Sequence, residues 1–225
     1  MAQETAQDME PAGHRGAGKG PKHPFASQAR RPGNRERPGP GRAPTLLFWG
    51  LLGALLLVVG SRVPARPEPT LAMDPSVAPD LQALAQETWA RFLAAFPAQR
   101  GCIRDVTLVA DPDLSDRAVY HVPTATVRVK VPGSAARLRA ALVHEWAHHL
   151  EITCPAHREL RPAFLRSLGL PVEAPWFQGQ AWEATPSEIY AEAAVELVLG
   201  SRSMPTKARV PSAAVERLRV WAQAR

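Results

Sequence analysis

The stretch His144-Glu145-Trp146-Ala147-His148-His149-Leu150-Glu151 decides how the rest of this sequence is interpreted. It contains the pattern H-E-x-x-H. A spacing of four residues places His144 and His148 one turn apart on the same face of a helix, where both imidazoles can reach one metal ion. Glu145 is about 100° round the helix from His144, close enough to touch a metal-bound water without being a ligand.

The residues before the motif predict the helix that carries it. Neither Gly nor Pro interrupts residues 134–152, so we expect one helix of about 18 residues with Ser134 as its N-cap. The side opposite the two candidate ligands is apolar and should be buried; it carries Leu138, Leu142, Trp146 and Leu150. His149 falls within this apolar arc, and we interpret it as a packed core histidine.

The N-terminal part of the chain differs from the rest in composition and charge. Residues 1–43 contain eight Lys/Arg and four Asp/Glu, and are rich in Gly, Pro and Arg, so we expect a disordered, basic cytoplasmic tail. Residues 61–225 are nearly balanced, with nineteen Lys/Arg and seventeen Asp/Glu, which argues against a nucleic-acid-binding domain. The preference for Arg over Lys, 23 to 4, indicates a GC-rich bacterial source.

Residues 44–61 predict a transmembrane helix. Nineteen residues between Arg42 and Arg62 carry no charge, and a helix of that length spans about 28 Å, close to the hydrocarbon thickness of a bilayer. Because the basic flank comes first, we expect the N-terminus in the cytoplasm and the rest of the chain outside. The long preceding tail favours a signal anchor over a cleaved signal peptide that would give a secreted protein. Gly50 and Ala54 predict weak self-association of the helix.

The remainder is predicted to be a Pro-rich linker, residues 62–79, followed by one domain, residues 80–225, of class α+β. A helix capped by Asp80 comes first, and three β-like runs follow it at residues 105–110, 118–122 and 126–131. The last run alternates Val with Arg or Lys, which we interpret as an exposed or edge strand of a small antiparallel or mixed sheet. Three further helices should follow the motif helix, at residues 156–168, 185–199 and 212–224.

A zinc ion that performs chemistry usually has three protein ligands and one open position, so a third ligand is required. Glu188 is our candidate, because Glu188, Glu192 and Glu196 form a row at i, i+4 and i+8 whose mutual repulsion a nearby cation would remove. The alternative is that Thr185 and Glu188 form a capping box at the start of the helix. Glu192 is the next candidate ligand.

The two cysteines offer two further interpretations. Cys102 and Cys154 both follow the predicted membrane span, so a single disulfide is their most economical use. Cys154 could instead be a ligand, because it stands ten residues after His144, where the longer pattern H-E-x-x-H-x-x-G-x-x-H has its last histidine. That pattern needs Gly at position 151, where this chain has Glu151.

These motifs resemble the zincin metallopeptidases, and among them the gluzincins, whose third ligand is a Glu on a later helix in a pattern E-x-x-A-D or E-x-x-x-D. The resemblance covers residues 118–199. It implies that His144, His148 and Glu188 bind Zn²⁺, that Glu145 is the general base, and that Glu192 orients a ligand histidine. This chain has Glu192 where the family usually has Asp.

The sequence therefore predicts a membrane-anchored, extracytoplasmic zinc metallopeptidase acting on a peptide or protein substrate. A donor for the developing oxyanion is also needed, and the candidates are Tyr190 and His157, with Tyr120 and His121 as further choices. Two alternatives remain open. One is a membrane-tethered binding or scaffolding module of the same fold without turnover, and the other is a purely structural zinc site completed by Cys154.

Overall fold

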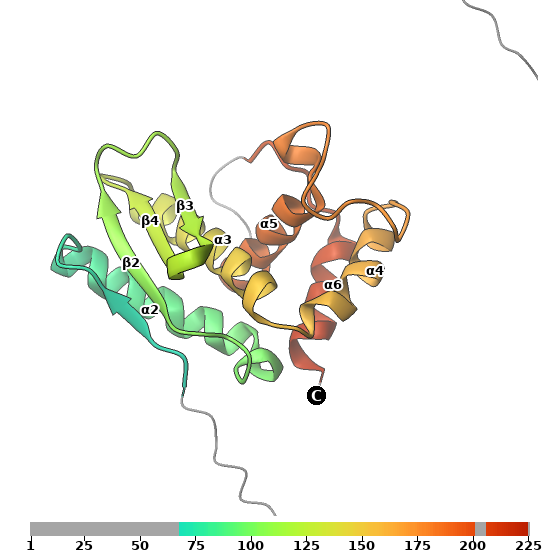
Figure 1. The fold of residues 1–225 in the computed structure, drawn as a ribbon, viewed down its shortest axis with the longest axis horizontal. Helices are drawn as coiled ribbons and strands as arrows, with labels where there is room; N and C mark the ends of the chain where they lie inside the picture. The colour runs from blue at the N-terminus through green and yellow to red at the C-terminus, as the bar shows by residue number, and fades with distance from the viewer. Residues whose placement is uncertain (1–67, 201–205, 225) are drawn as a thin grey trace, which may run out of the picture. The chain divides into compact units, whose positions relative to one another are not determined.

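The computed structural model describes residues 68–200 and 206–224, and Figure 1 shows how they are arranged. Within these ranges the chain has an α+β fold, with one mixed four-stranded sheet and five α-helices. The predicted cytoplasmic tail, residues 1–43, and the predicted membrane span, residues 44–61, lie outside the described residues. Among the helices that are described, none has the length and apolar character needed to cross a bilayer.

The sheet is mixed and has the strand order β1-β2-β4-β3. Strand β2 (Val106–Asp111) pairs in parallel with β1 (Leu71–Met73) on one side and with β4 (Thr126–Lys130) on the other. Strand β3 (Ala118–His121) is antiparallel to β4, from which the short 3-10 turn η2 (Val122–Thr124) separates it. β3 is therefore an outer strand of the described sheet.

The prediction of an edge strand at residues 126–131 was wrong, because β4 lies between β2 and β3. Val127 and Val129 are fully buried, whereas Arg128 and Lys130 are exposed. The alternation thus arises because helices cover one face of the sheet while solvent covers the other. Alternation in sequence distinguishes the two faces of a strand but not its position in the sheet.

The folded domain also begins earlier than residue 80. The strand β1 lies within the predicted linker, residues 62–79, and Leu71 is aligned with Val106 of β2. A strand of three residues is too short to show a period, so only its pairing partner reveals it.

Helices α2 (Pro79–Ala95) and α3 (Ala135–Thr153) enclose an aromatic core beneath the sheet. The Trp89 and Trp146 rings meet edge to face, with their centroids 5.0 Å apart, and Phe92 lies 5.9 Å from Trp146. Complete burial of such side chains stabilises a fold by about 1.5–3 kcal/mol each. α2 begins at Pro79 with Ala78 as N-cap, so Asp80 lies in the first turn instead of capping the helix as predicted.

The other helices follow α3 in the chain and agree closely with the predicted ranges. They are α4 (His157–Ser167), α5 (Pro186–Leu199) and α6 (Ser212–Gln223), with a 3-10 turn η3 (Trp182–Ala184) before α5. In Figure 1 they gather on the side of α3 away from the sheet, and α5 packs against both α3 and α6. The buried residues of α5 include Ala191, Ala193 and Ala194, whose small side chains permit close approach of a neighbouring helix.

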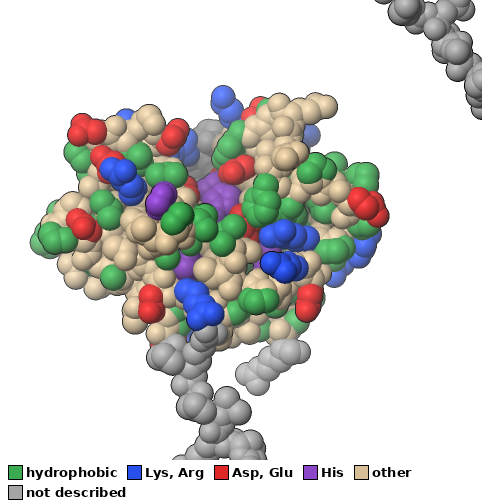
Figure 2. Space-filling view, viewed as in Figure 1, with side chains coloured by type: hydrophobic (Ala, Val, Ile, Leu, Met, Phe, Trp, Pro, Cys, Tyr) green, Lys and Arg blue, Asp and Glu red, His purple; other side chains and the backbone are tan. Residues whose placement is uncertain are grey.

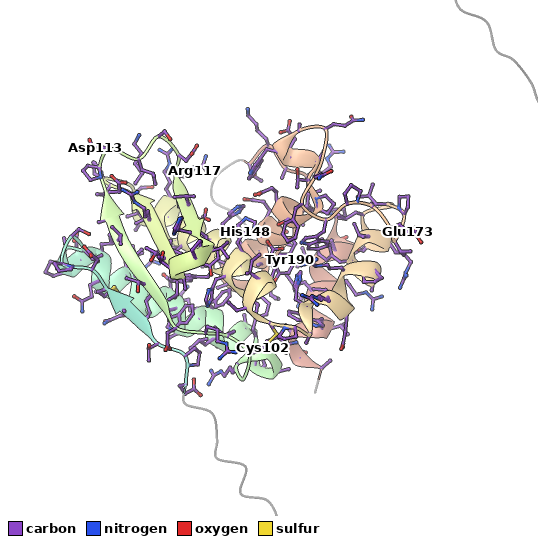
Figure 3. All side chains as sticks on the ribbon, in the orientation of Figure 1. Cys102, Asp113, Arg117, His148, Glu173 and Tyr190 are labelled. Carbon is purple, nitrogen blue, oxygen red and sulfur yellow. A yellow bond between two sulfur atoms is a disulfide. The ribbon has the colours of Figure 1, made fainter. Side chains whose placement is uncertain are left out.

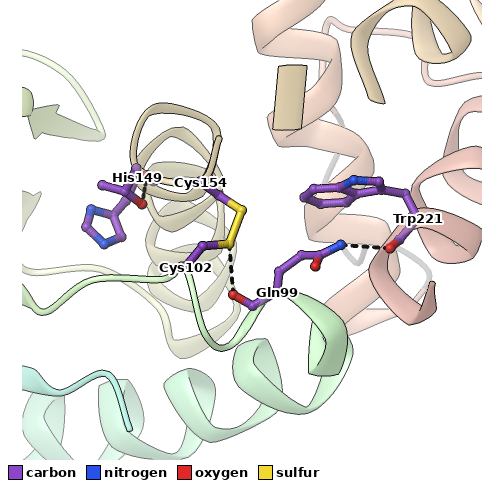
Figure 4. The surroundings of a disulfide bond; sticks show 6 residues. Gln99, Cys102, His149, Cys154 and Trp221 are labelled. Atoms are coloured by element: carbon purple, nitrogen blue, oxygen red, sulfur yellow. Dashed lines mark hydrogen bonds between the residues drawn. A yellow bond between two sulfur atoms is a disulfide. The ribbon is translucent and has the colours of Figure 1, made fainter. Parts of the chain in front are cut away.

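A disulfide bond joins Cys102 to Cys154, the pairing expected from the sequence (Figure 4). Cys154 is the C-cap of α3, and Cys102 follows the 3-10 turn η1 (Pro97–Gln99) at the end of α2. In the same region the Gln99 side-chain amide donates a hydrogen bond to the Trp221 carbonyl, at 2.8 Å. The C-terminal end of α3 is thus tied covalently to the chain that leads into β2.

Candidate metal centre

Helix α3 presents the H-E-x-x-H motif as its sequence predicts. Ser134 is the N-cap, and its hydroxyl accepts a hydrogen bond from the backbone N–H of Arg137 at 3.4 Å. The apolar side of the helix is buried, including Leu138, Leu142, Trp146 and Leu150. Burial of that side leaves His144 and His148 on the opposite face, with 12 % and 15 % of their side chains exposed.

Helix α5 brings Glu188 to both histidines. Glu188 Oε2 lies 3.1 Å from His144 Nε2 and 3.4 Å from His148 Nε2, and the two Nε2 atoms are 3.1 Å apart. Two ligands at about 2.1 Å from a tetrahedral zinc ion are separated by roughly 3.4 Å. The three donor atoms therefore have the mutual spacing of three corners of a zinc tetrahedron.

A carboxylate binds the other nitrogen of each imidazole. His144 Nδ1 lies 2.9 Å from Glu192 Oε1, and His148 Nδ1 lies 2.7 Å from Glu151 Oε1. Because an ionised carboxylate only accepts hydrogen bonds, each Nδ1 carries the proton in the neutral imidazole, and each Nε2 then presents its lone pair. Two lone pairs and the Glu188 carboxylate thus converge on one point, which a cation would stabilise.

Glu151 is a residue of the site whose role the sequence analysis missed. It is buried, and its carboxylate accepts three hydrogen bonds: from His148, from the Ser187 hydroxyl at 2.7 Å and from the Trp176 indole N–H at 2.6 Å. The available signal was an acid three residues after His148 on the same helical face. Trp176 and Ser187 could not be assigned to it, because both come from later segments of the chain.

The side chain of Glu188 does not cap α5. Thr185 is the N-cap, but its side chain makes no capping bond and donates instead to the Ala181 carbonyl at 3.0 Å. The capping-box alternative is therefore wrong, because the carboxylate of Glu188 lies beside the two histidines. Glu192 reaches His144 despite the extra methylene relative to Asp.

The histidines and carboxylates of this cluster shift the pKa of one another. Burial alone would lower the pKa of His148, but hydrogen bonds to Glu151 and Glu188 raise it to about 10. Burial would raise the pKa of Glu188, but hydrogen bonds from His144 and His148 lower it to about 2. Protons and a divalent cation therefore compete for the same three donor atoms.

Glu145 lies next to the histidines and is 8 % exposed. Burial raises the pKa of its carboxyl group, and the nearby histidines oppose this effect. The nearby backbone N–H of Tyr120 in β3 also lowers this pKa. A carboxylate whose pKa is raised toward neutrality is suited to accept a proton and to return it.

The prediction that Tyr190 or His157 donates to an oxyanion was wrong, because both side chains are fully buried. Tyr190 is two residues after Glu188, about 200° round α5, and so faces the core. Its ring meets that of His157 at 4.5 Å in a cluster with Trp176. Burial lowers the pKa of His157 to about 3, and the positive charge of Arg161 contributes.

The other candidates of the sequence analysis have partners of their own. The Tyr120 hydroxyl is 2.8 Å from Nδ1 of His149, a buried histidine that donates from Nε2 to the Arg104 carbonyl at 2.9 Å. His121 is hydrogen-bonded to Thr124. Cys154 is in the disulfide and cannot be a thiolate ligand, so the structural zinc site completed by Cys154 is ruled out.

The cluster opens into a cleft of about 880 Å³. Its lining includes His144, Glu145 and Glu192, and Trp182, whose ring stacks on His144 with centroids 5.9 Å apart. Figure 2 shows histidine side chains reaching the surface near the middle of one face of the molecule. The site is therefore accessible from solvent on one side and supported by buried carboxylates on the other.

Comparisons of the chain with protein-family models, with curated proteins and with solved structures found no match.

Proposed function

We propose that this protein is a zinc-dependent hydrolase of the zincin type, most simply a peptidase, with His144, His148 and Glu188 as the zinc ligands. The carrying observation is that their donor atoms converge at 3.1–3.4 Å, while carboxylates hold the opposite nitrogens of both histidines. Such carboxylates fix the orientation of ligand histidines and raise their basicity. A cluster of His and Glu on a protein surface that binds no metal does not require carboxylates on the opposite nitrogens of its histidines.

The choice of zinc follows from the donor set. Two imidazole nitrogens and one carboxylate oxygen are the ligand types of a catalytic zinc site, which keeps a fourth position open. A bound zinc ion would supply a Lewis acid that polarises a substrate carbonyl and makes water more acidic. Three protein donors, of which His144 lines the cleft together with Glu145, fit this arrangement better than a closed structural site does.

The residues of the chain then have distinct tasks. Glu145, buried beside the ligands and with a raised pKa, accepts a proton from water and passes it to the leaving amine. Glu192 and Glu151 keep the protons on the Nδ1 atoms of the two histidines. Trp182 stacks on His144 and limits the motion of its ring.

A peptide substrate is favoured by the position of β3. This strand is an outer strand of the described sheet, and the backbone N–H of Tyr120 on it is near enough to Glu145 to lower the pKa of that carboxyl group. An outer strand offers backbone groups with which an extended peptide can pair. A substrate bound in this way would pass directly over the general base.

The disulfide supports an extracytoplasmic location. Disulfides such as Cys102–Cys154 persist in oxidising compartments and are rare in the cytosol. We therefore retain the proposal that residues 44–61 anchor the chain in the membrane and that the domain works outside the cytoplasm.

The proposal is tested by metal analysis and by hydrolysis of an unstructured protein such as casein. We expect the wild type to bind one zinc ion per chain, Glu188→Ala to lose it, and Glu196→Ala, on the same row of α5, to retain it. Glu145→Gln should retain zinc while hydrolysis falls by at least a hundredfold. Stoichiometric zinc without any hydrolysis would favour the non-catalytic binding module, and the absence of zinc binding would refute the site itself.

A further inference from the structure

The cleft continues away from the candidate metal centre along α3. One face of this helix forms its floor, where Ala140 and Ala141 lie between His144 and Arg137. A second hollow, of about 270 Å³, shares part of this lining and extends the groove to Lys130. The residues common to both hollows are Ser115, Asp116, Arg117, Arg137 and Ala141.

The part of this groove away from the metal centre is positively charged. Arg117 and Arg137 line both hollows, Lys130 lines the smaller one and Lys207 the larger one, whereas Asp116 is the acid that both share. Arg117 and Arg137 are exposed, and neither forms an ion pair with a residue in the described ranges. Arg117 directly precedes β3 and is labelled in Figure 3.

Arg137 stands at a position where a helix more often carries an acidic residue. It lies in the first turn of α3, a turn that contains no acidic residue. The positive end of the helix dipole is at this terminus, so acidic side chains are preferred there and a guanidinium is repelled. A bound carboxylate would be attracted by the dipole, by Arg137 and by Arg117 together.

We propose that this groove selects substrates that carry a carboxylate about three residues from the bond to be cut, with Arg117 and Arg137 as the specificity-determining residues. The distance follows from helix geometry: seven residues from Arg137 to His144 correspond to about 10 Å, and an extended peptide advances about 3.3 Å per residue. The carboxylate is an acidic side chain or the C-terminus of the peptide. This inference rests on the proposed hydrolase, because it takes the metal centre as the place of cleavage.

The experiment measures binding and cleavage separately with the full-length, zinc-loaded chain. The probes are fluorescent peptides that differ only in Glu or Gln at one position, each made with a free and with an amidated C-terminus. Binding is followed by fluorescence anisotropy with Glu145→Gln, so that the probes stay intact. We expect a peptide with a carboxylate to bind about tenfold more tightly than the neutral one, and this difference to shrink as salt screens the charges.

The double variant Arg117→Gln/Arg137→Gln should abolish that preference, and Arg158→Gln should preserve it. Arg158 is a matched control because it is an exposed arginine on α4 that lines neither hollow. The comparison of Glu with a free C-terminus shows which carboxylate is recognised. Equal binding of the charged and neutral peptides to the wild type, or a preference that survives in the double variant, would overturn the inference.

Cleavage of casein, with the cut sites mapped by mass spectrometry, separates this inference from the proposed function. Acidic residues should be enriched near the third position from the cut in the wild type and not in the double variant. Cleavage without this enrichment would overturn the selection by the groove while the hydrolase stands. A binding preference without cleavage would support the groove and refute the hydrolase.

Discussion

Replacement of Glu151 by Gln tests whether the buried network behind His148 tunes a metal site. The carboxylate of Glu151 accepts from three donors: His148 Nδ1–H at 2.7 Å, the Ser187 hydroxyl at 2.7 Å and the Trp176 indole at 2.6 Å. A glutamine amide has one oxygen and one NH₂ group in place of two accepting oxygens. In one orientation its NH₂ faces the Trp176 N–H, and in the other it faces the His148 N–H.

Either orientation leaves a buried donor without an acceptor, which costs about 1–3 kcal/mol. It also removes the negative charge that keeps the imidazole basic, and loss of such an orienting partner typically reduces metal affinity by about ten- to a hundredfold. We therefore expect the zinc affinity of Glu151→Gln to fall by about that factor while the ligands themselves are intact.

The assay is competition for zinc between the full-length chain and a chromogenic chelator, at a temperature where circular dichroism shows both proteins folded. Glu196→Gln is the control, because it makes the same chemical change on α5 at a residue that forms no hydrogen bond or ion pair with His144 or His148. The expected loss of zinc affinity is at least about tenfold, which corresponds to about 1.4 kcal/mol of binding free energy. A zinc affinity within about twofold of the wild type would therefore refute the proposed orientation of His148 by Glu151.

Three further predictions concern stability. Zinc at about a thousand times its dissociation constant should raise the unfolding free energy of the wild type by about 4 kcal/mol, and that of Glu188→Ala by less, as measured by urea denaturation. If removal of zinc with a chelator unfolded the wild type completely, the site would be structural instead. The double variant Cys102→Ser/Cys154→Ser should have a free energy of unfolding lower by up to about 4 kcal/mol, because the disulfide closes a loop with a sequence separation of 52. An unchanged free energy of unfolding would contradict this and would mean that the unfolded variant keeps the two positions close together without the bond. His157 has a folded-state pKa of about 3, below its unfolded value of about 6.5, so the free energy of unfolding should fall as the pH falls from 6.5 toward 3, by up to about 1.4 kcal/mol per pH unit. In His157→Phe the free energy of unfolding should depend less on pH over this range. An identical pH dependence in the wild type and the variant would contradict a buried neutral histidine.

Local periodicity in the sequence determined the helices and the pair of histidines that face the candidate metal centre. The spacing of four residues places His144 and His148 on one face of α3 whatever surrounds the helix, and the apolar residues on the other face must be buried for the same reason. The class of the domain follows as well, since periods near 3.6 and 2 distinguish helices from strands without reference to distant residues.

The supporting residues depend on contacts between segments that are far apart in the chain. The row Glu188, Glu192 and Glu196 narrowed the choice of ligand, but only the packing of α5 on α3 brings Glu188 to Nε2 and Glu192 to Nδ1 of the same imidazole. Repulsion among these three acids indicates that a positive charge should lie near them, but it does not identify the acid that contacts that charge.

Tertiary structure alone decided the environment of Glu151, the burial of Tyr190 and the interior position of β4. Each depends on which segment covers a given surface: Trp176 and Ser187 enclose Glu151, the core encloses Tyr190, and β2 and β3 flank β4. The sequence determines the period of an element, and therefore its faces, because this is a property of neighbouring residues. What each face meets is determined by the free energy of the whole packed domain, to which residues many positions away contribute.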